Sequence, residues 1–263
     1  MNITFLGTGS AFCTKNYQTN AVVELDSGYK LLVDAGGDVR HAMEDVEMSY
    51  LDINGVYISH LHADHIGGLE GLAFATYFDP RYKGRLGLFC SEFLVDDLWN
   101  HCLRGGLASL QNKLATIDTY FAVRAVEKNG AFQAPKAYGG PAFNLIQVVH
   151  FVDSYTFQFS FGLMFQADDQ KVFMTTDTQF APAQIQDFYN EADVIFHDCE
   201  TAPFRSGVHA HFDDLTQLDE KTRSKIWLTH FQDNVMTDWD EWQTKAQQAG
   251  FHGFVRPQQQ FEF

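Results

Sequence analysis

Cysteine, positive charge and long hydrophobic runs are all scarce in this sequence. The 263 residues include four cysteines, scattered without CxxC spacing, so neither a thiolate zinc finger nor a disulfide framework is expected. The first residues lack the basic start and apolar stretch of a signal peptide, and no apolar run approaches the length of a membrane span. We therefore expect a protein of the reducing cytoplasm that is neither exported nor inserted into a membrane.

The shortage of basic residues limits the class of partner. Lys and Arg number 18 against 34 Asp and Glu, for a net charge of −16. Such a chain repels nucleic-acid backbones, so no stable nucleic-acid partner is expected. A small anionic substrate at a metal site needs only the local field of the metals and is not excluded.

The pattern of the chain predicts one α/β domain over residues 1–263, because no low-complexity tract or linker interrupts it. Strands are predicted at 2–6, 20–25, 29–34, 55–59, 86–90, 143–152, 156–166, 172–176, 193–197, 225–229 and 251–255. Helices are predicted near 38–47, 69–78, 91–103, 181–190, 212–221 and 238–248. Two halves of strands followed by helices indicate an αββα sandwich, two mixed sheets with helices on the outer faces. The least regular segment is 104–141.

A histidine-rich loop follows the apolar strand predicted at 55–59. Four ligand-type residues fall within six positions: His60, His62, Asp64 and His65. Imidazole and carboxylate are the ligands that zinc takes when thiolates are absent. The pair Gly67 and Gly68 is expected to let the backbone turn tightly enough for these ligands to converge. The alternative, surface histidines near a turn, would produce this arrangement by chance in roughly one of several hundred such chains.

This HxHxDH loop resembles that of the metallo-β-lactamase superfamily, and the resemblance spans nearly the whole chain. It implies that the first two histidines and a later one hold one metal, and that Asp64, His65 and another late histidine hold the second. A late aspartate bridges the two ions. The implied ligands of two zinc ions per chain are His60, His62, Asp64, His65, His150, Asp177 and His230. The resemblance also gives Asp34 a supporting role, orienting a metal-binding histidine.

Two further segments resemble the phosphodiesterase branch that includes tRNase Z. Residues 197–201 and 208–211 are variants of a His-Glu-Ala-Thr and a His-Ser-Thr segment of that branch. The resemblance implies a histidine near the leaving group, which we assign to His209, with Asp198 or Glu200 as its acidic partner. His211 is the alternative for this place and otherwise a substrate-binding residue. Asp64 is expected to serve catalysis as well as metal binding.

Over its full length the pattern looks most like phage and bacterial anti-Pycsar phosphodiesterases. That resemblance implies cleavage of cyclic nucleoside monophosphates, including cyclic CMP and cyclic UMP and by extension cyclic AMP and GMP, to 5′-nucleotides by a homodimer. An irregular loop within 130–141 is expected to help close the neighbouring copy's site. Arg104 and Tyr138 are candidates for a phosphate clamp and a base-stacking ring.

Three other functions compete with this interpretation. The main alternative is a tRNA 3′-processing endoribonuclease, which would hold tRNA with a basic Gly- and Pro-containing arm; the basic residues of 81–136 are instead dispersed among acids. A thioesterase of the glyoxalase II kind and a protein that only sequesters metal or ligand are the others. Neither accounts for a histidine at 209 beside an acidic segment.

Overall fold

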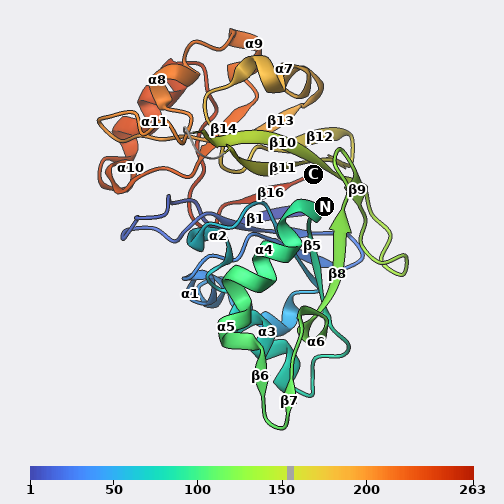
Figure 1. The fold of residues 1–263 in the computed structure, drawn as a ribbon. Helices are drawn as coiled ribbons and strands as arrows, with labels where there is room; N and C mark the ends of the chain where they lie inside the picture. The colour runs from blue at the N-terminus through green and yellow to red at the C-terminus, as the bar shows by residue number, and fades with distance from the viewer. Residues whose placement is uncertain (153–156) are drawn as a thin grey trace.

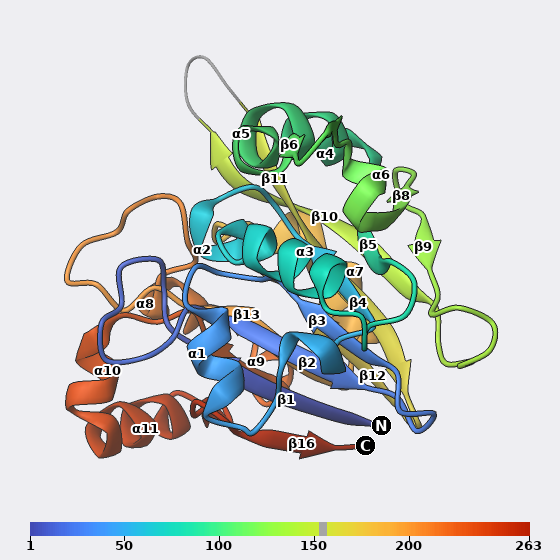
Figure 2. The same ribbon diagram turned by 90° about the horizontal axis from the view of Figure 1, so that it is seen from below.

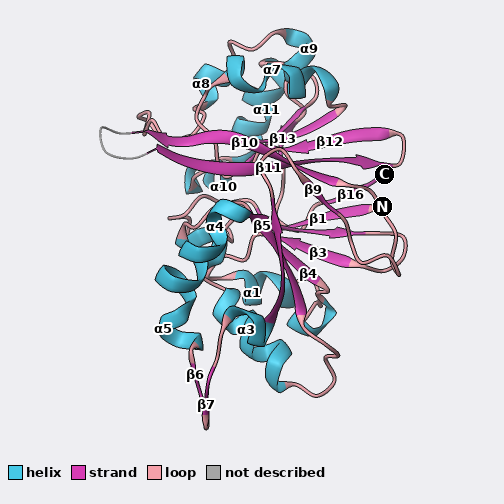
Figure 3. Cartoon of the chain, turned by 45° about the vertical axis from the view of Figure 1, so that its right-hand side comes forward, coloured by secondary structure: helices cyan, strands magenta, loops and turns pink. Residues whose placement is uncertain are grey.

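Two seven-stranded sheets packed face to face form the centre of the protein in the computed structural model, which describes residues 1–152 and 157–263 (Figure 1). Helices cover the outer face of each sheet (Figure 3). This arrangement confirms the αββα sandwich predicted from the order of the elements.

The first sheet runs in the order β16-β1-β2-β3-β4-β5-β8. Its four strands from β16 to β3 pair antiparallel, and β3, β4, β5 and β8 pair parallel. The bounds are β1 Asn2–Gly7, β2 Asn20–Glu24, β3 Lys30–Val33, β4 Gly55–Ile58, β5 Leu86–Ser91, β8 Phe121–Val126 and β16 Gln260–Glu262.

The second sheet repeats this division, in the order β15-β14-β13-β12-β11-β10-β9. Strands β9 to β12 pair antiparallel, and β12 to β15 pair parallel. The bounds are β9 Ala131–Phe132, β10 Phe143–Val152, β11 Phe157–Ala167, β12 Gln170–Met174, β13 Val194–Asp198, β14 Ile226–Thr229 and β15 Gly253–Phe254. A separate hairpin joins β6 Ser109–Leu110 to β7 Lys113–Leu114.

Buried side chains alternate between the two faces of each sheet. In β3, Leu31 and Val33 belong to the core between the sheets, whereas Leu32 packs against the outer helices. In β13, Phe196 faces the other sheet and Ile195 the helices outside. Because successive side chains of a strand point to opposite faces, strands buried on both sides read as continuous apolar runs.

The helices form two outer layers (Figure 1). Those of the first half are α1 Val39–Glu44, η1 Tyr50–Asp52, α2 Ala63–Ile66, α3 Leu69–Phe78, α4 Glu92–Asp97, η2 Leu98–Leu103, α5 Arg104–Leu107 and α6 Ile117–Tyr120. Those of the second half are α7 Pro182–Glu191, α8 Phe212–Leu215, α9 Glu220–Arg223, α10 Asp233–Thr237 and α11 Trp239–Gln248. Among the described residues, no helix is long and apolar enough to cross a membrane.

The structure differs from the sequence predictions in a few elements. The segment expected to be least regular contains β8, which pairs with β5 inside the first sheet. The helix predicted over 212–221 is two short helices, because Asp219 caps a new one by accepting the backbone N–H of Thr222 at 2.9 Å. The start of the strand predicted at 156–166 lies outside the described residues.

Candidate metal centre

The histidine-rich loop turns immediately after β4. Strand β4 ends at Ile58, and His62 is the N-cap of the short helix α2. Gly67 and Gly68 were expected to allow an unusual backbone turn, but their φ angles are −60° and −87°. A Cβ at Gly68 would lie 2.5 Å from the carbonyl oxygen of Gly36. Close packing, and not a left-handed turn, therefore requires glycine at this position.

The later site residues come from the same edge of the second sheet. His150 lies on β10, beside a register shift between Val149 and Phe151, and Asp198 ends β13. Asp177 follows β12 by three positions, and His230 directly follows β14. Parallel strands present their carboxyl ends at one edge of a sheet. The fold thus brings residues that are 85 to 170 positions away from the loop in the sequence to one place.

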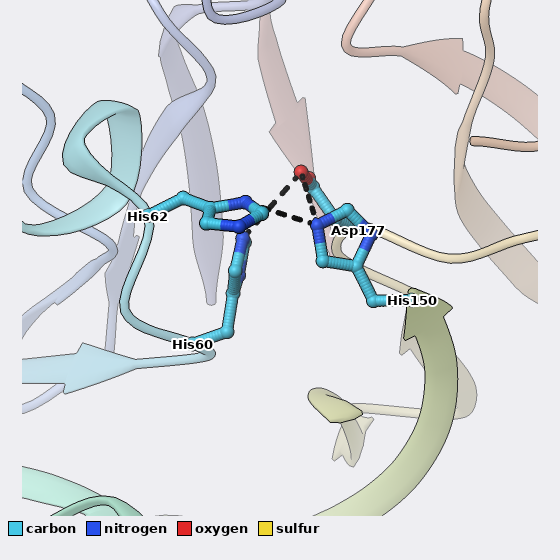
Figure 4. Close-up of side chains that lie close together, drawn as sticks. All are labelled: His60, His62, His150 and Asp177. Carbon is cyan, nitrogen blue, oxygen red and sulfur yellow. Dashed lines mark hydrogen bonds and ion pairs between the residues drawn. The ribbon is translucent and has the colours of Figure 1, made fainter. Parts of the chain in front are cut away.

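One cluster combines two residues of the loop with two of the second sheet (Figure 4). Ligand atoms of His60, His62, His150 and Asp177 all lie within 4.8 Å of one another. The Nε2 atoms of His60 and His150 are 3.6 and 3.8 Å from Oδ2 of Asp177. His150 Nε2 lies 3.0 Å from His62 Nδ1. Three imidazoles and one carboxylate so placed match the donors of a tetrahedral zinc site.

A second cluster lies on the other side of Asp177. Ligand atoms of Asp64, His65, Asp177 and His230 also lie within 4.8 Å of one another. His65 Nε2 is 3.2 Å from Asp64 Oδ2 and 3.3 Å from Asp177 Oδ2. His230 Nε2 is 3.3 Å from Asp64 and 3.4 Å from the other oxygen of Asp177. The structure therefore brings all seven predicted ligands together, with Asp177 shared by the two clusters.

Unpartnered ring nitrogens test whether these residues fit a metal. The buried Nε2 atoms of His60 and His65 have no hydrogen-bond partner within the described part of the chain. Their Nδ1 atoms contact Ser59 and Asp34 at 3.0 and 2.8 Å, and His150 Nδ1 lies 3.1 Å from the Val208 carbonyl. With Nδ1 donating, the neutral form of each imidazole presents the lone pair of Nε2 to the cluster. A cation would satisfy nitrogens that burial otherwise penalises by about 1–3 kcal/mol each.

One buried carboxylate, Asp34, orients two of the histidines. It accepts the backbone N–H of Ser59 at 2.8 Å and the hydroxyl of Ser59 at 2.7 Å, and it contacts His65 Nδ1. Ser59 in turn accepts from His60. Sequence reasoning found Asp34 but missed Ser59, whose only signal was its position directly before His60.

The backbone is unusual at three places around the clusters. Asp34, Thr176 and His230 have φ angles of 60°, 54° and 62°. The left-handed region is uncommon for non-glycine residues and least favourable for β-branched Thr. Such conformations cost about 1–3 kcal/mol each and gather at functional sites. Each of these backbone conformations orients a side chain toward the clusters. Asp34 contacts His65, Thr176 directly precedes Asp177, and His230 is itself a member of the second cluster.

Charge divides the histidines into neutral and protonated groups. Burial lowers the pKa of His60 well below its usual range and that of His150 to about 4. Burial also acts on His65 and His230, but Asp177 and neighbouring carboxylates outweigh it. They raise the pKa of His65 well above its usual value and that of His230 to about 10. The carboxylates thus attract positive charge to the place where a cation would bind.

His209 faces the clusters from a separate loop. Its Nδ1 lies 2.8 Å from Oδ2 of buried Asp198 and 3.9 Å from Oδ2 of Asp177. Burial lowers the pKa of His209, but the carboxylate of Asp198 outweighs this and raises it. Asp198 also accepts the backbone N–H of Thr178 at 2.8 Å, which fixes its orientation. The pair therefore favours the protonated form of the His209 imidazole beside the shared aspartate.

His211 and Glu200 point elsewhere. His211 Nδ1 accepts the backbone N–H of Asp213 as the N-cap of α8, and its Nε2 lies 3.0 Å from the Ala202 carbonyl. Glu200 accepts the backbone N–H of Ser206 at 2.9 Å. Both residues hold the loop that carries His209 in place.

Arg104 and Tyr138 lie apart from the clusters. Arg104 begins α5, and in residues 1–152 and 157–263 it has no ion pair. The ring of Tyr138 lies 5.0 Å from that of Tyr29, just before β3, whereas Asp34 follows the other end of that strand. Figure 1 shows this loop at the end of the sandwich opposite α2. The structure does not bring either residue to the site of its own chain.

Comparisons with known proteins agree with this geometry. A family model described as "Anti-Pycsar protein Apyc1" matches residues 1–261. The chain is 35% identical over 238 residues to the anti-Pycsar protein of Bacillus phage vB_BveM-Goe7, covering 89% of this chain and 90% of that protein. It is 33% identical over 267 residues to the anti-Pycsar protein of Paenibacillus harenae, covering all of both.

Solved structures show the same fold at low identity. The metallo-β-lactamase fold protein YhfI from Bacillus subtilis has a TM-score of 0.72 and 17% identity, covering 99% of this chain and 98% of that one. A diphosphatase from the PhnP family has a TM-score of 0.74 and 19% identity, covering 100% and 97%. The chain, which carries clusters of His and Asp that could hold metal ions, is therefore a metal-dependent hydrolase of the metallo-β-lactamase fold and belongs to the anti-Pycsar protein Apyc1 family.

Proposed function

We propose that this protein is a dizinc phosphodiesterase that hydrolyses cyclic nucleoside monophosphates to 5′-nucleotides. Cyclic CMP and cyclic UMP are the first candidates, with cyclic AMP and cyclic GMP cut as well. The observation that carries the proposal is the pair of four-residue clusters that share Asp177. Membership of the anti-Pycsar family supports a role against a cyclic-nucleotide defence, in a bacterial cytoplasm.

The proposed ligands divide between two ions. His60, His62 and His150 would hold one, Asp64, His65 and His230 the other, and Asp177 both. Zinc suits a set of imidazoles and carboxylates without thiolates, and two such ions would lower the pKa of a water and polarise the phosphoryl oxygens. Elemental analysis is expected to give about two zinc ions per chain, since seven ligands exceed the needs of one tetrahedral ion. A stoichiometry of one, unchanged by added zinc, would contradict this.

The chain's own residues supply the proton transfer. His209, held by Asp198 at 2.8 Å, is the proposed acid that donates its proton to the 3′ oxygen as the phosphodiester bond breaks. Asp198 keeps the imidazole protonated and oriented. Asp64 is proposed to act through its place in the second cluster. Glu200 and His211 would support the loop instead of touching substrate.

A panel of substrates tests the function. Purified protein is incubated with the four cyclic mononucleotides, a pre-tRNA and S-lactoylglutathione, each with and without a chelator. We expect chelator-sensitive conversion of all four cyclic nucleotides to 5′-monophosphates, at rates that differ by about 10-fold or less, the size of one hydrogen bond. Faster cleavage of pre-tRNA at matched low salt would favour the tRNA-processing alternative, which the charge of −16 opposes.

We also propose a homodimer in which the loop at 130–141 closes the neighbour's site. Tyr138 remains half-exposed at 39%, far from the clusters of its own chain, so its contribution would be to the second copy. Arg104, which also lies apart from the clusters of its own chain, remains a candidate phosphate clamp for the site of the second copy. A monomeric mass by light scattering at working concentration would count against the dimer.

A further inference from the structure

A cavity beside His209 has no part in the catalytic scheme above. It has a volume of 360 Å³ and lies between two loops, one after β1 and one after β13. Figure 2 shows these loops next to one another, the first in blue and the second in orange, at the edge that carries α2. The volume falls in the range of small-molecule sites, which begins at about 300 Å³.

Two exposed aromatic rings stand on the wall of this cavity. Phe12, from the first loop, is 93% exposed, and Phe204, from the second, is 68% exposed. Each gives up the stabilisation that burial of a Phe side chain provides, about 1.5–3 kcal/mol. Their loops come from different sheets yet bring both rings to one cavity, as a clamp for a flat ligand requires.

The cavity borders the metal centre at His209. That residue lines the cavity, while its Nδ1 lies 3.9 Å from Oδ2 of Asp177 and its ring centroid 4.7 Å from that of His230. A molecule whose phosphate lies at the shared carboxylate can therefore extend past His209 into the cavity. The occupant must combine a phosphate with a flat aromatic group on a short spacer.

Polar atoms around the cavity are largely engaged in holding its walls. Glu200 accepts a hydrogen bond from the backbone N–H of Ser206, and the Ser206 hydroxyl accepts one from the backbone N–H of Val208 at 3.2 Å. Asp233 accepts the backbone N–H groups of Thr14 and Lys15. The wall thus favours recognition of the face of a ring over recognition of its polar edge.

We propose that this cavity is the nucleobase subsite and that Phe12 and Phe204 hold the base by stacking. The inference rests on the proposed function and adds specificity-determining residues to it. Every nucleobase has an aromatic face, so stacking binds pyrimidines and purines alike. The structure thereby accounts for broad use of cyclic mononucleotides.

Kinetics on a matched pair of substrates test the subsite. The first is cyclic CMP, and the second is methyl riboside 3′,5′-cyclic phosphate, which keeps the ring phosphodiester but has a methoxy group in place of the base. Phe12→Ala and Phe204→Ala are each expected to lower kcat/KM for cyclic CMP by about 10-fold, and the baseless substrate is expected to be unaffected. Phe12→Tyr, which keeps the ring, should restore wild-type kinetics.

The control is Phe78→Ala, which removes a 62%-exposed Phe from α3 and should change neither substrate. Equal losses on both substrates would overturn the inference, because the rings would then act on the loops and not on the base. A dimer that becomes a monomer in Phe12→Ala or Phe204→Ala would also overturn it. If wild-type protein cleaves neither substrate, the proposed function itself fails; if it cleaves both and the variants match it, only the subsite fails.

Discussion

The His209 imidazole lies between buried Asp198 and the shared Asp177, in a group with His230 whose ligand atoms could themselves hold a metal ion. We predict that His209 serves proton transfer and not metal binding. His209→Ala is expected to keep the bound zinc and to slow turnover of cyclic CMP by about 100-fold or more, the usual effect of losing a positioned acid. Single-turnover rates and zinc content measured on the same preparation check this. A variant that loses one of its zinc ions would instead make His209 a ligand.

His211 provides the matched control, since it lies two residues away and its hydrogen bonds are to the backbone of Asp213 and Ala202. His211→Asn keeps an acceptor for the N-cap of α8, and Asn is among the best residues at that position. We expect turnover within about threefold of wild type and a small loss of stability, on the order of 1 kcal/mol. An effect on turnover larger than that of His209→Ala would exchange the roles of the two histidines.

Asp34 acts on the metal only through His65 and Ser59. Asp34→Asn removes the charge but preserves the backbone, because Asn tolerates the left-handed region in which Asp34 lies at φ 60°. Losing such a partner of a ligating histidine typically reduces metal affinity by about 10- to 100-fold. Competition with a chromophoric chelator measures this, and unchanged zinc affinity with wild-type thermal stability would remove Asp34 from the site.

At the scale of elements, strands buried on both faces were readable from their apolar runs, but charged or short strands were not. Strand β8 has exposed Arg124 and Ala125 in its middle, and it lies between the Gly pairs at 105–106 and 139–140 that made the whole segment read as irregular. The four ligands of the loop were predicted from one motif, and the three later ones from the family resemblance, each at the end of an apolar run. The choice between Asp198 and Glu200 stayed open because residues 197–201 match the family segment imperfectly and an extra residue can lie within them. In the structure, Asp198 contacts His209, and Glu200 accepts a hydrogen bond from Ser206.

The turn between α2 and α3 gives a test of close packing. An added methyl at Gly68 would lie 2.5 Å from both the Gly36 carbonyl and Val39 Cγ1, whereas one at Gly105 within α5 would meet nothing within 4 Å. Gly68→Ala is expected to lower the free energy of unfolding by about 1–3 kcal/mol through overpacking. Gly105→Ala should be neutral or raise it by up to about 1 kcal/mol, the helical advantage of Ala. Urea unfolding of the zinc-loaded protein compares them, and equal effects would contradict the argument.

At the scale of the whole molecule, the two halves of the chain each build one sheet, and the site forms only where their edges meet. The loop after β4 supplies four of the proposed ligands and the second sheet the other three. That residues 1–263 act as one domain remains a prediction. The single-domain prediction agrees with the composition of the clusters, because each cluster takes residues from both halves of the chain.

The clustered carboxylates also couple metal binding to pH. In the metal-free fold, the pKa of His65 lies well above its usual value of 6.5, and that of His230 is about 10. Both imidazoles are therefore expected to carry a second ring proton, and a positive charge, at about pH 8. The charged form of His230 therefore stabilises the metal-free fold fully below its unfolded pKa of 6.5, and this contribution is lost as the pH rises through about 10.

A metal ion needs the lone pair that each of these protons occupies. Zinc binding at about pH 8 is thus expected to release about two protons per chain, and fewer as the pH approaches 10. Calorimetry in two buffers of different ionisation enthalpy counts these protons. If zinc binding released almost no protons at about pH 8, both imidazoles would already be neutral before zinc binds, and the prediction would be wrong.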